Sequence, residues 1–101
     1  MIKRIWHGWT TQDNAEKYFD VLIKTVIPGI EEKKISGYKG FEVLRKENGD
    51  EVEFVTIITF ESLQNVIDFQ GEDYTVAYVP DAARVVLKRW DQHCLHYESL
   101  K

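Results

Sequence analysis

Apolar and polar residues alternate most clearly over residues 41–60, on either side of an Asn48-Gly49 pair. An Asn-Gly pair between two alternating runs is typical of a two-residue β-hairpin turn. With these two residues as the loop, Phe41 is expected opposite Thr56, because directly paired residues share a face. One face of this hairpin is strongly apolar and carries Phe41, Val43, Val52, Phe54, Ile58 and Phe60.

The opposite face of the hairpin mixes apolar and polar side chains, so it is not a simple solvated face. We expect it to meet another protein surface. Its members are Tyr38, Leu44, Val55 and Ile57 together with Glu42, Glu53 and Thr59.

The residues before the hairpin predict a strand and a helix. Residues 2–9 alternate with bulk on both faces, which is typical of a strand buried twice. Residues 10–13 contain N-cap candidates, and Pro28-Gly29 is expected to interrupt the helix before a further turn or two over residues 30–35. The helix is predicted from apolar residues at helical spacing, namely Ala15, Tyr18, Phe19, Leu22, Ile23 and Val26.

The second half of the chain predicts one more helix and a closing strand. Ser62 is an N-cap candidate for a helix that buries Leu63, Val66 and Ile67, with Phe69 or Gln70 as a further member of the stripe. Gly71 is expected to end this helix. Residues 72–80 are ambiguous, and residues 81–90 fit either a helix or an extended segment. Residues 93–100 alternate as a strand would.

This order of elements predicts an α+β, ferredoxin-like βαββαβ fold in a single domain over residues 1–101. Both helices then cover one face of an antiparallel sheet, and the other face stays open. Because that open face is too apolar for water, we expect it to be covered by a second copy of the chain in a homodimer.

Composition narrows the setting. The formal net charge is -4 with interspersed signs, so no basic stripe is available for nucleic acid. The longest apolar stretches are too short to span a membrane, and the N-terminal residues do not resemble a secretory signal. A single cysteine fits a reducing compartment, so a soluble, cytoplasmic protein without membrane contact is expected.

Five segments, residues 5–10, 37–45, 54–62, 69–73 and 96–98, carry a resemblance over nearly the whole chain. In these segments the chain resembles the antibiotic biosynthesis monooxygenase-like proteins of the dimeric α+β barrel superfamily. The resemblance implies a barrel of two four-stranded sheets and a pocket between helices and sheet in each subunit. It also implies oxidation of phenols or quinols without a cofactor, haem cleavage, or isomerisation and decarboxylation of small rings. Haem cleavage is disfavoured, because no histidine occurs between His7 and His93.

The candidate catalytic residues are His96, His7 and Asp73. First and last strands are neighbours in a ferredoxin-like sheet, so the two histidines are expected near each other. A histidine beside a carboxylate can take the proton of a phenol, and the phenolate can then give an electron to oxygen. Aromatic walls would hold a flat substrate. The candidate substrate-binding residues are Trp6, Trp9, Tyr38, Phe60, Glu72 and Tyr97.

For each of these residues a structural role is the competing interpretation. Tryptophans on a doubly buried strand usually pack in a core or a dimer interface, and the carboxylates after Gly71 fit a helix stop. A metal site is not expected, because strand alternation separates His93 from Cys94 and His96. Nothing nearby is expected to activate Cys94 as a nucleophile.

Three functions remain open. The first is a cofactor-independent monooxygenase that acts on a small aromatic compound. The second is a dimeric small-ligand-binding or stress-response protein without catalysis, and the third is a non-redox isomerase or decarboxylase.

Overall fold

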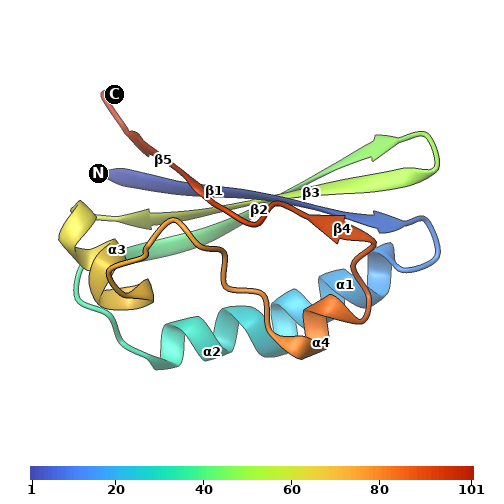
Figure 1. The fold of residues 1–101 in the computed structure, drawn as a ribbon, viewed down its shortest axis with the longest axis horizontal. Helices are drawn as coiled ribbons and strands as arrows, with labels where there is room; N and C mark the ends of the chain where they lie inside the picture. The colour runs from blue at the N-terminus through green and yellow to red at the C-terminus, as the bar shows by residue number, and fades with distance from the viewer.

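An antiparallel sheet forms one layer of the molecule, and the helices cover one of its faces (Figure 1). The computed structural model describes all residues from 1 to 101. Strand β3 lies between β2 and β1, and both β4 and β5 pair with the other edge of β1. The fold is therefore α+β, compatible with the ferredoxin-like βαββαβ arrangement. The strands are β1 (Ile2–Thr11), β2 (Tyr38–Asn48), β3 (Glu51–Phe60), β4 (Arg89–Trp90) and β5 (Leu95–Glu98).

The β2–β3 hairpin has the predicted faces but a different register. Its loop is Gly49-Asp50, and Phe41 pairs with Ile58 rather than with Thr56. Gly49 is the first of the two loop residues and has φ +66°, which is the positive φ that a type II′ turn requires at that position. The predicted register was wrong by two residues. A shift of two residues leaves every side chain on its expected face, because strand alternation has a period of two.

Tyr38 lies on the helix side of the sheet, not on the open face where it was predicted. The register of the β2–β3 pairing shifts between Tyr38 and Gly40, which is the signature of a β-bulge at Lys39. The extra residue reverses the alternation at the start of β2. The Tyr38 ring consequently packs edge-on against Phe60, with ring centroids 6.1 Å apart.

The first helical segment is longer than predicted, because Pro28-Gly29 does not end it. Helix α1 (Ala15–Val21) continues through a π-helical turn, η1 (Leu22–Val26), into α2 (Ile27–Glu32). Proline lacks an N–H and its ring clashes with the carbonyl four residues earlier, and a π-helical turn before Pro28 relieves both problems. The buried stripe is also narrower than predicted: Phe19 and Ile23 are half-exposed, and the buried residues are Ala15, Tyr18, Leu22, Val26 and Ile30.

Helix α3 (Leu63–Gln70) begins and ends where the sequence predicts, but its buried residues are Val66 and Phe69. Leu63, which was predicted to be buried, is exposed, because the first turn of the helix lies at the edge of the core. Ser62 and Asn65 form a reciprocal capping box at its N-terminus, and Gly71 with φ +101° follows its last residue. The ambiguous residues 72–80 form no helix or strand apart from one isolated bridge between Val76 and His93. Residues 81–90 contain both predicted alternatives, a short helix α4 (Asp81–Arg84) and strand β4.

The fourth strand of the expected sheet is divided into two pieces. β4 pairs with Gly8 and Trp9, whereas β5 pairs with Ile2 to Ile5. Four residues of the edge chain, 91–94, lie between these pieces, opposite only two residues of β1. The strand predicted over residues 93–100 is thus shorter than expected and covers only Leu95–Glu98.

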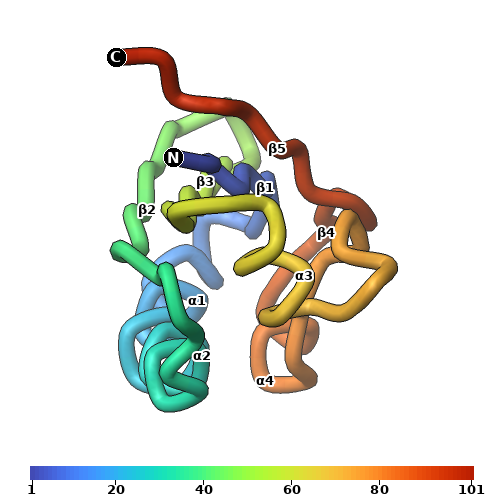
Figure 2. The backbone as a smooth tube through the Cα atoms, turned by 90° about the vertical axis from the view of Figure 1, so that its left-hand side faces the viewer, coloured from blue at the N-terminus to red at the C-terminus, as the bar shows by residue number.

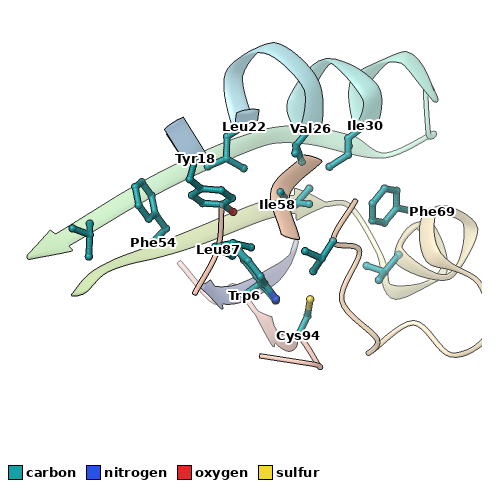
Figure 3. Close-up of a cluster of buried hydrophobic side chains, with 14 of the residues drawn as sticks. Trp6, Tyr18, Leu22, Val26, Ile30, Phe54, Ile58, Phe69, Leu87 and Cys94 are labelled. Atoms are coloured by element: carbon teal, nitrogen blue, oxygen red, sulfur yellow. The ribbon is translucent and has the colours of Figure 1, made fainter. Parts of the chain in front are cut away.

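The hydrophobic core lies between the sheet and the helices. Figure 2 shows α1 and α2 below one side of the sheet and α3 and α4 below the other. Side chains from both layers point toward one another, including Leu22 and Val26 from the long helical segment and Phe54 and Ile58 from β3 (Figure 3). No helix is long and apolar enough to cross a membrane.

Candidate functional site

A cavity opens between the sheet and the helices. Its atom-free space amounts to about 480 Å³ when the open mouth is included. The long helical segment contributes one wall, β1 and β3 the second, and the chain around α4 the third. Its lining is mainly apolar and includes Leu22, Val26, Ile58, Phe69 and Val79.

Strand β1 supplies the cavity with its largest aromatic side chain, Trp6. The indole ring lies over the backbone of Gly8, where an added Cβ would come within 2.5 Å of it. The indole Nε1 donates a hydrogen bond to the carbonyl oxygen of Asp91, at 2.8 Å. Trp6 is thus fixed between β1 and the chain that follows β4, and its ring forms part of the cavity wall (Figure 3).

Arg4 is the residue of this site that sequence reasoning missed. It lies on the same face of β1 as Trp6, lines the cavity and is only 3% exposed. Its Nη1 donates to the carbonyl oxygen of Tyr74 and lies 3.0 Å from Nε2 of His96, and its Nη2 donates to the carbonyl oxygen of Val76 at 2.9 Å. A charged side chain at an inward position of a strand was the available signal.

No carboxylate lies within salt-bridge distance of Arg4. Burial lowers the pKa of the guanidinium, which nonetheless stays charged in proteins. Cys94 is another ionisable group in the cavity wall, and burial raises the pKa of its thiol, with a smaller opposing effect from Arg4. The cavity therefore contains one buried cation with no anionic partner.

His96 lies behind Arg4, on the helix side of the sheet. Burial, with the charge of Arg4 as a second cause, lowers its pKa to about 4. Since an arginine can only donate, Nε2 of His96 accepts the hydrogen bond from Arg4. The ring also packs edge-on against Tyr74, at 5.1 Å between centroids. A neutral imidazole whose lone pair is already engaged is poorly suited to take a proton from a substrate.

The mouth of the cavity is aromatic and positively charged. Tyr78 lines the cavity and is 44% exposed, and its ring packs edge-on against Phe69. The ammonium group of Lys33 lies over both rings, 4.8 Å from the centroid of Phe69 and 5.0 Å from that of Tyr78.

His7 does not lie near His96. His7 projects from the open face of β1, where its Nδ1 is 2.8 Å from Oε2 of Glu53. His96 is paired with Arg4 on the other face, so the sheet separates the two histidines. Trp9 also lies on the open face, stacked on His7 and covered by the guanidinium of Arg89 at 3.9 Å. The expected pair of histidines is therefore not formed within one chain.

The other predicted site residues lie outside the cavity wall. Glu72 and Asp73 are exposed on the chain after α3, and Tyr97 is exposed on the open face. Phe60 is fully buried between Tyr38 and Phe69 as part of the core. The hydroxyl of Tyr38 donates to Glu31 at 2.8 Å, and burial with this hydrogen bond raises its pKa. No group of three or more histidine, cysteine, aspartate or glutamate side chains is arranged to hold a metal ion.

No protein-family model matches the chain, and none of the curated proteins gives a significant match to it. The fold and the cavity therefore define the protein at the level of class: a ferredoxin-like α+β domain with a mainly apolar cavity between sheet and helices, and a buried arginine in its wall.

Proposed function

We propose that the protein binds a small aromatic molecule in the cavity between helices and sheet. The observation that carries the proposal is the lining, in which a mainly apolar surface surrounds very few polar groups. Small-molecule sites have this composition, since apolar walls supply affinity and a few polar groups fix orientation. The Trp6 ring and the Tyr78 ring offer flat surfaces to a ligand ring.

A pair of substitutions in α4 tests the location of this site. Ala83 is buried and lines the cavity, whereas its neighbour Ala82 is exposed. Ala83→Leu places extra side-chain volume in the cavity, and we expect it to weaken binding of 4-methylphenol at least tenfold in titration calorimetry. Ala82→Leu adds the same volume outside and should leave binding unchanged. Equal affinity in both variants would contradict the proposed location.

The reaction we propose is oxidation of a bound phenol or quinol by dioxygen without a cofactor, as the resemblance to antibiotic biosynthesis monooxygenase-like proteins implies. The apolar lining supports it, because exclusion of water from the bound ring protects reactive intermediates. Oxygen uptake with a panel of hydroxynaphthoquinols tests this reaction. Uptake that requires the protein and is abolished by Ala83→Leu is the expected result.

Binding without catalysis is the second candidate, and the state of His96 favours it. The lone pair of its Nε2 is engaged by Arg4, and no histidine lines the cavity, so no imidazole is free to act as base there. Calorimetric binding of a quinol without any oxygen uptake would support this candidate and contradict the oxygenase proposal.

We propose further that a second copy of the chain covers the open face of the sheet. The support is a band of apolar side chains on that face: Ile5, Val55 and Ile57 in its centre, with Leu95 52% exposed beside them. Such a patch is costly to leave in water, and two-fold pairing would bury both copies.

Sedimentation of matched lysine variants tests the dimer. Leu95→Lys places a charge in the apolar band, and we expect it to shift the protein toward monomers. Leu100→Lys is the control, because Leu100 is 88% exposed and follows the last strand. A wild-type protein that stays monomeric at high concentration would refute the proposal.

A further inference from the structure

The buried cation in the cavity wall has fewer partners than its chemistry allows. A guanidinium has five N–H donors. Arg4 uses three of them, two on Nη1 and one on Nη2, and all three acceptors are neutral. The N–H on Nε and one N–H on Nη2 remain without a protein partner, in a side chain that is 97% buried, since its exposed fraction is 3%.

The net charge of the cavity is positive. Its wall contains four groups that can ionise, namely Arg4, Tyr18, Tyr78 and Cys94. Burial raises the pKa of Tyr18 and of Cys94, so both are uncharged at neutral pH. A buried charge without a counter-charge is costly, and an anion bound beside it removes that cost.

We infer that the ligand of this cavity is an aromatic anion, a phenolate or a carboxylate, whose charged oxygen accepts hydrogen bonds from the free N–H groups of Arg4. This inference rests on the proposed function, because it names the class of ligand for the same cavity. The ammonium group of Lys33 at the mouth adds a second positive charge on the entry path. Charge-assisted hydrogen bonds of this kind are about twice as strong as neutral ones.

A purely structural role for Arg4 is the competing explanation. Its bonds to the carbonyl oxygens of Tyr74 and Val76 attach the chain after α3 to strand β1. Together with the hydrogen bond to Nε2 of His96, these bonds use both N–H groups of Nη1 and one of Nη2, but neutral donors would serve equally well. The guanidinium also lies over the ring of Phe69, with Cζ 5.6 Å from the ring centroid, and this contact offsets part of its charge. The remaining two donors have no partner in the protein, and an anionic ligand would use both.

With Arg4 beside it, a bound phenol could lose its proton without a histidine base. A nearby cation stabilises the phenolate and lowers the pKa of the bound phenol. The O–H bond breaks with its electron pair left on oxygen, and the proton passes to solvent water at the mouth of the cavity. No oxidant or cofactor takes part in this step.

The colour of bound 4-nitrophenol tests the inference directly, because its phenolate is yellow and its phenol is colourless. We expect saturating protein to lower the pH midpoint of the colour change by about 1–3 pH units, the usual effect of an opposite charge nearby. An apolar cavity without an effective charge would raise the midpoint, because desolvation disfavours the anion. A raised or unchanged midpoint for the bound probe would overturn the inference.

Three variants separate the effect of the charge of Arg4 from its contribution to folding. We expect Arg4→Gln to raise the midpoint above that of free 4-nitrophenol, and Arg4→Lys to keep it lowered. Lys33→Gln, at an exposed position, should keep most of the shift. If Arg4→Gln does not fold, the sign of the wild-type shift and the Arg4→Lys result still decide the question.

Neutral 4-methylphenol distinguishes a failure of the anion inference from a failure of the proposed binding cavity. Suppose that 4-methylphenol binds and that Ala83→Leu weakens its binding, but that the pH midpoint of the colour change of bound 4-nitrophenol is not lowered. The anion inference then fails, and the proposed cavity remains. If neither compound binds, the proposed function fails and the inference fails with it.

Discussion

Acid should weaken the fold through His96 in a defined pH window. The ring lies beside the buried cation of Arg4, and its pKa is lowered from 6.5 to about 4 in the folded protein, first by burial and then by that charge. In the unfolded chain the same ring takes up its proton near pH 6.5. The folded state therefore binds fewer protons between these two values, so the free energy of unfolding falls as the pH falls through this range.

The size of the effect follows from the two pKa values. The difference between about 4 and 6.5 corresponds to at most about 3.4 kcal/mol, at 1.36 kcal/mol for each pH unit. Part of the ring is open to solvent, which screens the interaction with Arg4, so we expect about 1–2 kcal/mol. The stabilising contribution is fully present above pH 6.5 and is lost progressively down to about pH 4.

Urea unfolding of two glutamine variants measures this contribution. His96→Gln keeps an acceptor for Arg4 but does not titrate, so its advantage over wild type should grow by about 1–2 kcal/mol between pH 7 and pH 4.5. His93→Gln is the control, because His93 is exposed and its side chain contacts only the hydroxyl of Thr75. A difference between wild type and His96→Gln that does not change with pH would refute the reasoning.

Two further substitutions test local features of the fold. Thr10→Val should raise the free energy of unfolding by about 1 kcal/mol, and the melting temperature by about 4–8 °C, because Thr10 is fully buried and its Oγ1 has no hydrogen-bond partner; a lower melting temperature would reveal a partner for the hydroxyl. Gly37→Ala should lower the free energy of unfolding by about 2–4 kcal/mol, since Gly37 has φ +85° and a Cβ there would lie 2.1 Å from Oδ1 of Asn65. Gly29→Ala, whose Cβ would meet nothing within 4 Å, is the control for Gly37→Ala, and its stability should not fall.

The parts of the fold with strong local signals were predictable from the sequence. Alternation placed Val52, Phe54 and Phe60 on the core face of the hairpin, and it did so even with the wrong register, because the error was an even number of residues. Ser62 and Gly71 define the ends of α3 through capping chemistry that acts within a few residues.

Features that depend on contacts between distant segments were not predictable. The β-bulge near Tyr38 and the division of the last strand into β4 and β5 have no clear pattern in the sequence. No tight turn sets the register of β5 on β1. The sequence therefore gave no means of placing His7 and His96 on opposite faces. The π-helical turn that carries the helix past Pro28 likewise has no recognisable pattern in the sequence.

The cavity likewise contains one residue that the sequence suggested and one that it did not. Trp6 was a candidate substrate-binding residue because an aromatic ring can hold a flat ligand, but the sequence did not indicate whether its ring faces the cavity or the open face. Arg4 was missed, because a charged side chain is normally exposed and its partners come from residues 74, 76 and 96, far along the chain. Only the folded arrangement brings these acceptors to it.

A crystal structure of the protein with bound 4-nitrophenolate tests the central claim most directly. We expect the ring of the ligand in the cavity against Trp6, and its charged oxygen at about 2.7–2.9 Å from Nε or Nη2 of Arg4, the usual length of such bonds. A ligand bound instead on the open face beside Trp9, or one in the cavity whose oxygen points away from Arg4, would contradict the claim.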